Sequence, residues 1–439
     1  MKKILVLTTL LYVLSIGAIN AQWVAQSSGV ADRLVGCHAL SDNIVWVGGN
    51  SGDVFLTTDG GDSWFNHPIP DATQRVTSLY ALDTKTVTAI TINTTKSLGF
   101  RIYRTTDGGT TWTILYDDTK SFADAVRFFD ANNGIALGDP DNDDKRFWRI
   151  LLTSDGGASW KLIDSTLVPI ADSAKVEQGV SNGMDVIGNN VWFCTINGGS
   201  STTFVPHVYH SADKGKTWTS TAVTMLGYIQ GIAFADEKTG YAVDLYGKAA
   251  KTTDGGNTWT AITALTTSSN YPRAVKYRQA SNDIFAVGNA GVAYVSQNDG
   301  ISWDQPAPAT TSNFRGLTVS PTSNTCWAVG DNGIIFKWDE NSTDVKICGS
   351  IPTKFDLSQN YPNPFNPTTQ INYSVPKECK VTLKVYDILG HEVATLVNGT
   401  KSAGSYMVSF DASKLSTGVY IYRLEAGANI FSKKLMLMK

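Results

Sequence analysis

The stretch TTDGGTTW at residues 105–112 is one of six copies of a turn in the chain. The other copies are TTDGGDSW at 57–64, TSDGGASW at 153–160, SADKGKTW at 211–218, TTDGGNTW at 252–259 and SQNDGISW at 296–303. Successive tryptophans of these copies lie 41 to 58 residues apart. Such a spacing is typical of the blades of a β-propeller rather than of a helical solenoid.

Each repeat also carries the same order of strand-like runs. In one repeat GIAFAD, TGYAVD and KAAKTT precede the turn, and a fourth run begins at the tryptophan. Four short strands in each of several similar units predict an all-β fold in which four-stranded sheets surround a common axis.

The invariant turn positions have structural explanations, so we expect no chemistry from them. The acidic side chain can accept hydrogen bonds from backbone N–H groups of its own turn, and asparagine can do the same. The glycine can adopt a positive φ without steric cost, and the tryptophan can bury its ring between adjacent layers while its N–H bonds locally. These positions are Asp59, Gly61, Trp64, Asp107, Gly109, Trp112, Asp155, Gly157, Trp160, Asp213, Gly215, Trp218, Asp254, Gly256, Trp259, Asn298, Gly300 and Trp303.

The turns resemble the Asp-box, or BNR repeat, of sialidases, sortilin-type receptors, oligoxyloglucan hydrolases and photosystem II assembly-factor propellers. The wider pattern, AVG-x-x-G followed by TTDGG-x-x-W, is most similar to that of the assembly-factor group. This resemblance implies a β-propeller and leaves the function open, because propellers host both enzymes and binding proteins.

A seventh unit, at 314–340, lacks the turn. Its missing outer strand can come from QWVAQSS at 22–28, which would close the ring and remove two exposed sheet edges. We therefore expect seven blades over residues 22–340, with six or eight as the alternatives because the fourth repeat is long.

The composition argues against nucleic acid as a partner. The net charge is −3 and charged residues make up 17% of the chain, whereas phosphate binding needs a concentrated excess of Lys and Arg. The 12 tryptophans and 39 glycines suit an all-β protein with many turns.

The N-terminus has the pattern of a secretory signal peptide. Lys2 and Lys3 precede a short apolar run at 4–16, and small residues follow up to Ala21. We expect residues 1–21 to be removed and the mature chain to begin at Gln22, with no transmembrane segment. An uncleaved membrane anchor is the alternative.

The five cysteines fit neither a zinc site nor a disulfide scaffold, because their number is odd and their spacing wide. We expect mostly free buried thiols, with Cys326–Cys348 as the one candidate bridge.

The repeated blade pattern of the sequence ends after residue 340. Residues 341–354 are predicted to be a linker, and 355–439 a small Ig-like β-sandwich. Alternating apolar residues mark two of its strands, one at Val381, Leu383 and Val385 with Tyr386, the other at Tyr420, Tyr422 and Leu424.

This tail resembles the type A C-terminal sorting domain of the type IX secretion system. The resemblance rests on YPNPFNP, VYDILGHEV, LSTGVYIYRL and the basic end KKLMLMK. It implies the type IX translocon as a partner, export across the outer membrane, and release or surface attachment of the propeller. A generic adhesive Ig-like module is the alternative.

Catalytic patterns are weak. Sialidases carry an Arg-Ile-Pro and an arginine triad, and the chain has no such tripeptide. A glycoside hydrolase would need two carboxylates facing each other across a cleft, for which Asp124, Asp139 and Glu177 are the candidates.

Several cationic and aromatic residues fall where innermost strands open onto the central channel. These strands are expected to start near Arg33, Arg75, Asp124, Gln178, Gln230, Arg273 and Arg315. The four arginines, with Tyr228, Tyr271 and Phe314 nearby, form a candidate surface for an anionic or aromatic ligand. The alternative is that isolated arginines only solvate the channel mouth.

Metal sites have little support. Asp139, Asp141 and Asp143 alternate like the first oxygen ligands of a calcium loop, but the later Gly and Glu of an EF-hand are absent. A solvated acidic hairpin is the favoured interpretation, and His207 with His210 is too little for zinc. No other cofactor is indicated.

These patterns together predict a secreted or surface-attached propeller that binds an extracellular protein or glycan without catalysis. The alternative function is a glycoside hydrolase, sialidase-like or oligoxyloglucan-hydrolase-like, acting on extracellular polysaccharide.

Overall fold

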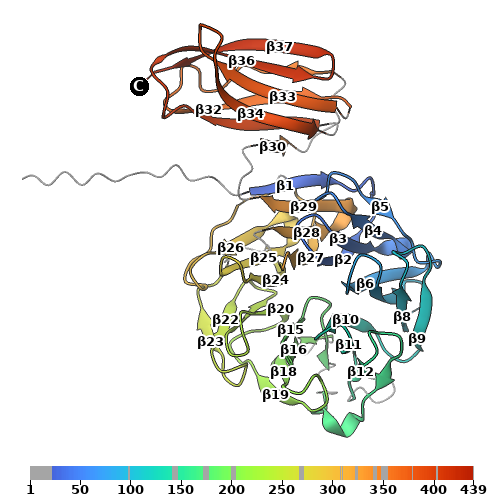
Figure 1. Cartoon of the computed structure of the whole chain (residues 1–439). Helices are drawn as coiled ribbons and strands as arrows, with labels where there is room; N and C mark the ends of the chain where they lie inside the picture. Colours follow the sequence, from blue (N-terminus) through green and yellow to red (C-terminus); the bar gives the residue numbers. More distant parts are fainter. Residues whose placement is uncertain are drawn as a thin grey trace, which may run out of the picture.

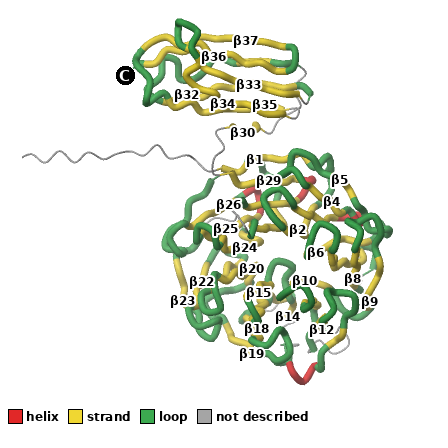
Figure 2. Tube along the Cα trace, in the orientation of Figure 1, coloured by secondary structure: helices red, strands yellow, loops and turns green. Residues whose placement is uncertain are grey.

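The computed structural model describes most of the chain as β-strand (Figures 1 and 2). The described residues are 22–96, 99–140, 147–171, 177–198, 204–265, 271–306, 308, 310–321, 325–339, 344–347, 354–377, 379–401 and 404–438. The predicted signal peptide at 1–21 lies outside them.

In the described part of residues 22–339, seven β-sheets form a closed ring (Figure 1), and one further two-stranded sheet pairs β14 with β17. Each innermost strand contacts the innermost strands of both neighbouring sheets, and the last contacts the first. The predicted seven-bladed β-propeller is therefore confirmed. The innermost strands, which define blades 1 to 7, are β2 (Leu34–Ala39), β6 (Gln74–Ala81), β10 (Ala123–Phe128), β15 (Met184–Ile187), β20 (Ile229–Phe234), β24 (Pro272–Arg278) and β27 (Phe314–Val319).

The second strand of each blade is almost wholly buried, because the neighbouring blades cover both of its faces. Its sequence is accordingly apolar and rich in small residues, as in CWAVG. The second strands are β3 (Val45–Gly49), β7 (Val87–Asn93), β11 (Gly134–Gly138), β16 (Asn190–Cys194), β21 (Gly240–Asp244), β25 (Asp283–Gly288) and β28 (Cys326–Gly330).

The third and outer strands complete the blades, and the outer ones are mostly exposed. The third strands are β4 (Val54–Thr57), β8 (Phe100–Thr105), β12 (Arg149–Thr153), β18 (His207–Ser211), β22 (Ala249–Thr252), β26 (Ala293–Ser296) and β29 (Ile334–Asp339). The outer strands are β5 (Phe65–Asn66), β9 (Thr113–Asp118), β13 (Lys161–Leu162), β19 (Thr219–Ala222) and β23 (Thr260–Ile262), with a single bridge Val295–Asp304 in blade 6. Short 3-10 turns lie at η1 (Asn50–Gly52), η2 (Ser165–Leu167), η4 (Asn289–Gly291) and η5 (Asp331–Gly333).

Blade 7 is built from both ends of the propeller sequence. Strand β1 (Gln22–Ser27) pairs antiparallel with β29, from Gln22 opposite Asp339 to Ser27 opposite Ile334. The expectation that residues 22–28 supply the missing outer strand is thus met, and the ring closes by backbone hydrogen bonds.

The repeated turn joins the third strand to the outer strand and is held by a recurring set of hydrogen bonds. In blade 2 the Thr105 hydroxyl accepts the Gly109 N–H at 2.9 Å. Asp107 accepts the Thr111 N–H at 2.9 Å and the Thr111 hydroxyl at 2.7 Å. The six turn glycines have φ between 79° and 97°. The hydroxyl one residue before each tryptophan is part of the turn; Ser or Thr stands there in all six copies, although the sequence analysis assigned it no role.

Each turn indole packs against a hydrophobic cluster shared by its own blade and the preceding one. Trp64 of blade 1, for example, meets Trp327 of blade 7 edge to face, with ring centroids 6.0 Å apart. Four indole N–H groups donate to backbone carbonyls, whereas those of Trp64 and Trp160 are buried with no partner among the described residues. Packing of the ring against the cluster between two blades, rather than the N–H bond, is therefore what the six positions share.

The cysteines of the described residues are free thiols. Cys326 at the start of β28 is a free thiol packed in the hydrophobic cluster between blades 6 and 7, and its suggested partner Cys348 lies outside the described residues. Burial raises the pKa of Cys194 and of Cys326, which keeps both thiols neutral.

The C-terminal part forms two four-stranded antiparallel sheets around one hydrophobic core. Val381, Leu383 and Val385 are fully buried, as the alternating pattern predicts. One strand, β30, falls inside the predicted linker and pairs with β35. The strand order of the first sheet is β30 (Asp344–Ile347), β35 (Gly404–Asp411), β32 (Thr368–Val375), β31 (Asp356–Leu357). That of the second sheet is β34 (Glu392–Lys401), β33 (Cys379–Tyr386), β36 (Gly418–Ala426), β37 (Asn429–Leu437).

A search of the described residues for a helix with the length and apolar character of a membrane span found none.

Replacing Trp23 tests the closure of the ring. Its indole is 5% exposed and packs against Phe285, Phe314 and Trp338. Trp23→Ala is expected to lower the free energy of unfolding by about 3–5 kcal/mol, measured by denaturant titration. Phe65→Ala, in an exposed outer strand, is the control and should cost much less. Equal losses for the two variants would contradict the closure argument.

Candidate functional site

The innermost strands carry β-bulges at the end where they enter the channel. Six of the seven show a register shift there, and the unpaired extra residue of a bulge can point away from the sheet. The sequence offers no direct sign of these bulges. The extra residues are Val35, Thr77, Asp124, Gln230, Arg273 and Arg315.

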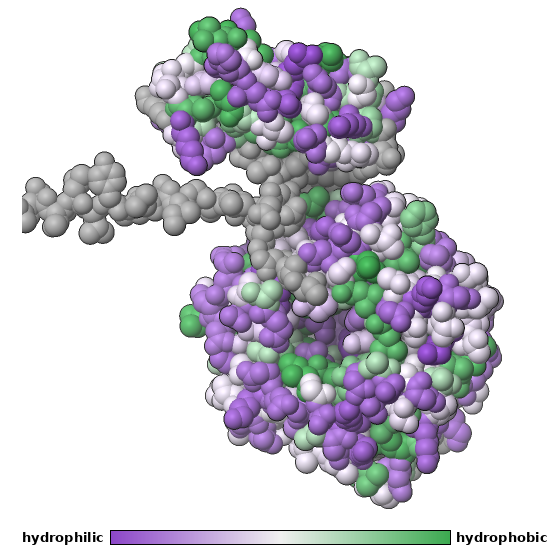
Figure 3. Space-filling view, viewed as in Figure 1, coloured by the Kyte–Doolittle hydropathy of each residue, from purple (hydrophilic) through white to green (hydrophobic). Residues whose placement is uncertain are grey.

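The four predicted arginines do gather at this end of the channel. We call Arg33, Arg75, Arg273 and Arg315 the arginine mouth. Arg273 and Arg315 are bulge residues, whereas Arg33 and Arg75 precede the bulges of their strands, so the four are not strictly equivalent. Figure 3 shows a polar hollow at the centre of the ring on the face toward the viewer.

Residues that follow the second strands fix the arginines in place. Arg33 Nε lies 2.7 Å from Asp331 Oδ1, and Arg315 Nη2 lies 2.7 Å from Asp331 Oδ2. Arg75 Nε donates to Asn50 at 2.8 Å. Arg273 donates to Asn289 at 3.1 Å and to Gln230 at 3.2 Å. Sequence analysis did not identify these acceptors.

The mouth carries a surplus of positive charge. Burial, together with nearby Arg33 and Arg315, lowers the pKa of Arg75. Burial and Arg315 do the same for Arg273. Although burial would raise it, hydrogen bonds from Arg315 and Asn313 bring the pKa of Asp331 to about 2, so this carboxylate stays ionised.

Two carboxylates, Asp32 and Asp331, face these four guanidinium groups, which leaves an excess of two positive charges. Part of the mouth is a polar cleft of about 540 Å³ lined by Arg33, Arg75, Asn50 and Asp331 among others. The arrangement can hold a ligand with several carboxylate or other anionic oxygens.

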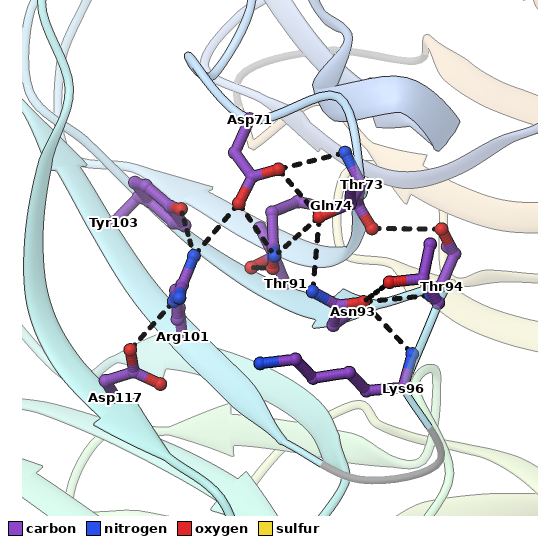
Figure 4. A network of polar contacts seen from close by, with 11 residues as sticks. Asp71, Thr73, Gln74, Thr91, Asn93, Thr94, Lys96, Arg101, Tyr103 and Asp117 are labelled. Atoms are coloured by element: carbon purple, nitrogen blue, oxygen red, sulfur yellow. Dashed lines mark hydrogen bonds and ion pairs between the residues drawn. The ribbon is translucent and has the colours of Figure 1, made fainter.

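A polar network surrounds the start of β6, where Gln74 immediately precedes Arg75 (Figure 4 shows the network). Gln74 is 1% exposed and accepts the Thr91 hydroxyl at 2.7 Å. Asp71 accepts hydrogen bonds from the N–H and the hydroxyl of Thr73. It also forms an ion pair with Arg101, whose Nη1 lies 3.0 Å from Asp71 Oδ2. This network fixes the backbone at residues 71–74, directly before Arg75.

Aromatic rings continue the surface on the side of blades 4 to 6. Tyr228 lies 6.0 Å from Tyr246, and Tyr246 lies 6.4 Å from Tyr271, both edge to face. Phe204 adjoins Tyr228 at 6.3 Å. Tyr246 is 50% exposed. The predicted Tyr228 and Tyr271 therefore belong to one cluster, whose other two members sequence reasoning missed. Phe314 is instead fully buried in the core.

Blade 4 departs from the expected pattern. Gln178 does not start its innermost strand, because β14 (Glu177–Gln178) pairs separately with β17 (Ile196–Asn197), and β15 starts at Met184. Between them, residues 179–183 form a loop where other blades have a one-residue bulge. Asn182 Nδ2 donates to the carbonyl oxygen of Arg315 at 2.6 Å and lies 3.4 Å from that of Arg273. This loop therefore crosses the channel from blade 4 to blades 6 and 7.

The loop also covers a buried pair of acids. Asp124 and Asp139 share a hydrogen bond, and Asp139 accepts the Gly179 N–H at 2.7 Å. A Cβ at Gly179 would overlap Asp124 Oδ2, which has no partner in the described part of the chain. Burial raises the pKa of Asp124 well above its usual value and that of Asp139 to about 7. The pair therefore keeps a proton near neutral pH.

The third acidic candidate lies elsewhere. Glu177 is buried and accepts the Thr195 hydroxyl at 2.7 Å, with His207 Nδ1 at 3.0 Å. His210 instead contacts Asn190 at 2.8 Å, so the two histidines do not converge.

Of the three calcium candidates, only Asp139 lies within the described residues. Asp139 belongs to the acid pair, and Asp141 and Asp143 lie outside the described residues. Among the described residues, no three His, Cys, Asp or Glu side chains form a metal-binding group.

Comparisons with known proteins support both folds. Residues 359–438 match the secretion system C-terminal sorting domain, which confirms the interpretation of the tail and implies export by the type IX system. No curated protein matches the chain.

Solved structures similar to the propeller include YCF48 bound to D1 peptide, with 18% identity and a TM-score of 0.54. That match covers 72% of this chain and 96% of YCF48. YCF48 from Cyanidioschyzon merolae matches with 17% identity and a TM-score of 0.53, over 73% of this chain and 100% of the other. The likeness to this photosystem II assembly factor is one of fold: this chain joins a YCF48-like β-propeller to a secretion system C-terminal sorting domain.

The acid pair predicts a pH-dependent stability. Because the folded pKa of Asp139 exceeds its unfolded value, the native state binds more protons than the unfolded state between about pH 4 and about pH 7. The free energy of unfolding should therefore fall as pH rises through this window. Asp139→Asn is expected to remove on the order of a few kcal/mol of this fall.

Denaturant titrations at a series of pH values provide the measurement. Asp62→Asn, at an exposed position, is the control and should retain the wild-type pH dependence. If Asp139→Asn followed the wild-type curve, the pair would not hold a shared proton.

Proposed function

We propose that this chain is an exported, non-catalytic binding protein whose arginine mouth holds a carboxylate-bearing segment of a partner protein. The observation that carries the proposal is the excess of two positive charges among four guanidinium groups at one end of the channel. Guanidinium groups bind carboxylates through paired N–H donors, and their charge is permanent.

The neighbouring aromatic cluster supports a protein partner. Arginine and tyrosine are both enriched in the centres of protein interfaces, where they supply most of the binding energy. The exposed ring of Tyr246 lies between Tyr228 and Tyr271, so a segment leaving the arginines toward blade 5 would meet an aromatic surface.

The D1 peptide bound to one of the YCF48 structures is consistent with this occupant. It is evidence that a propeller of this fold can hold a peptide. The chemistry of the ligand for the present chain is inferred from its own arginines. An acidic glycan would use the same charges, and binding experiments distinguish the two.

The geometry of the acid pair supports a non-catalytic role. A glycoside hydrolase needs carboxyl groups roughly 5 to 10 Å apart, with room between them for sugar and water. Asp124 and Asp139 instead share a hydrogen bond beneath the loop at 179–183.

The sorting domain supports a site of action outside the cell for the proposed binding activity. Type IX export delivers its cargo to the cell surface or the medium. A predicted signal peptide at residues 1–21 would carry the chain across the inner membrane first. We propose that the propeller then meets its partner at the surface.

Removing two arginines tests the mouth. The double variant Arg75→Gln/Arg273→Gln keeps Arg33 and Arg315 on Asp331 and should weaken binding at least tenfold. The probe is a short fluorescent peptide rich in Asp and Glu, measured by anisotropy at low salt.

Lys216→Gln/Lys238→Gln removes the same charge from exposed rim positions and is the matched control. An amide version of the peptide, with Asn and Gln, should not bind. Binding of polygalacturonate in place of the peptide would assign the arginine mouth to glycans. Unchanged peptide binding by the Arg75→Gln/Arg273→Gln variant would refute the arginine mouth as the binding site.

Deleting the sorting domain tests export. A chain ending after residue 339 retains the closed ring and is expected to accumulate in the periplasm of a host that has a type IX system. Cell fractionation with immunoblotting measures this. The full chain is the control, and its appearance outside the cell at the same level as the truncated chain would contradict the proposal.

A further inference from the structure

A separate cavity lies at the other end of the channel. Its volume is about 220 Å³, and all seven innermost strands contribute to its wall. Strands β24 and β27 run from Arg273 and Arg315 at the arginine mouth to Lys276 and Leu317 at this cavity. Asn182, in the loop at 179–183, donates to the backbone carbonyls of Arg273 and Arg315. This loop therefore lies on the arginine side of the cavity.

Two cations and one carboxylate line the cavity wall. Lys276 Nζ lies 3.6 Å from Asp185 Oδ1, while Asp185 Oδ2 accepts the Phe234 N–H at 2.8 Å. Arg127 donates from Nη1 to two neutral oxygens, the Val126 carbonyl at 2.8 Å and the Ser78 hydroxyl at 3.2 Å. Burial lowers the pKa values of both Lys276 and Arg127, and the nearby Asp185 carboxylate opposes this shift. With both bases protonated, the cluster has an excess of one positive charge.

The other titratable groups of the cavity cannot balance this charge. Burial, with Arg127 and Lys276 nearby, lowers the pKa of His38 to about 3, so its ring is neutral. Burial raises the pKa of the Cys37 thiol to about 12. It also raises the pKa values of Tyr80 and Tyr277, which keeps both phenols protonated.

An uncompensated charge in such a recess favours an anion. Electrostatic attraction is several times stronger in a protein interior than in water, and a charge taken from water without a partner is costly. The volume is below the roughly 300 Å³ of pockets for drug-sized ligands, so a small ligand suits the cavity better than a polymer segment. A compact anion with two or more acceptor oxygens matches both the charge and the size.

We propose that this cavity is a second binding site, which takes one small oxyanion, a short carboxylate or inorganic phosphate, between Arg127 and Lys276. Arg127 supplies a planar pair of N–H donors and Lys276 a point charge. The site does not depend on the arginine mouth or on the function proposed for it.

Calorimetric titration of the folded chain tests the site. Acetate and inorganic phosphate are added separately in a zwitterionic buffer of low ionic strength. We expect one anion per chain, and the arm that binds more tightly identifies the oxyanion. Absence of saturable binding in both arms would overturn the proposal.

Three variants locate the binding. Arg127→Gln should weaken it at least tenfold. Asp185→Asn leaves an amide oxygen for the Phe234 N–H and removes the negative charge, so it should tighten binding several-fold. Lys238→Gln, at an exposed rim position away from both ends of the channel, is the control and should leave the affinity unchanged.

The variants also give results that would refute the site. Loss of anion binding in Arg75→Gln but not in Arg127→Gln would assign the anion to the arginine mouth. Weaker binding in Asp185→Asn would mean that the carboxylate does not oppose the ligand. Because Asp185→Asn predicts a gain, misfolding of Arg127→Gln cannot produce the expected pattern.

Discussion

Face-to-face packing of neighbouring blades is the constraint on which the rest of this structure depends. Each blade buries both faces of its second strand, and a turn indole packs against the cluster between its own blade and the preceding one. A single four-stranded sheet could not bury these faces alone, so the blades are stable only as a ring. The pairing of β1 with β29 completes that ring and places the seven innermost strands around one channel.

The channel derives its chemistry from irregularities in otherwise similar strands. A bulge at the entrance of an innermost strand presents a side chain that regular pleating would place elsewhere. Blades 6 and 7 present Arg273 and Arg315 in this way, and blade 3 presents Asp124. Blade 4 replaces the bulge with a loop, so similar blades produce a cationic mouth, a buried acid pair and a bridge across the channel.

The two ends of the channel differ in the ligands that they suit. The arginine mouth is a wide polar cleft beside exposed aromatic rings, which fits a segment of a macromolecule. The opposite cavity is smaller and is lined by residues of all seven innermost strands, which fits one compact anion. Because the loop with Asn182 lies on the arginine side of the cavity, the two ends can bind their ligands separately.

The sorting domain was recognised by the resemblance of its motifs to a known family. The sequence alone determined the blade repeat, the seven-fold ring and its closure by residues 22–28. These features follow from local patterns, since turn residues, alternation and repeat length act over short distances along the chain. Only the tertiary structure decided which polar side chains meet. Arg33 and Asp331 are separated by almost the whole propeller sequence, and Asn182 reaches Arg315 across the channel. Bulges and an inserted loop change the direction of side chains without a clear sequence signal, which is why Gln178 was misplaced and why the Asp124–Asp139 pair became visible only in three dimensions.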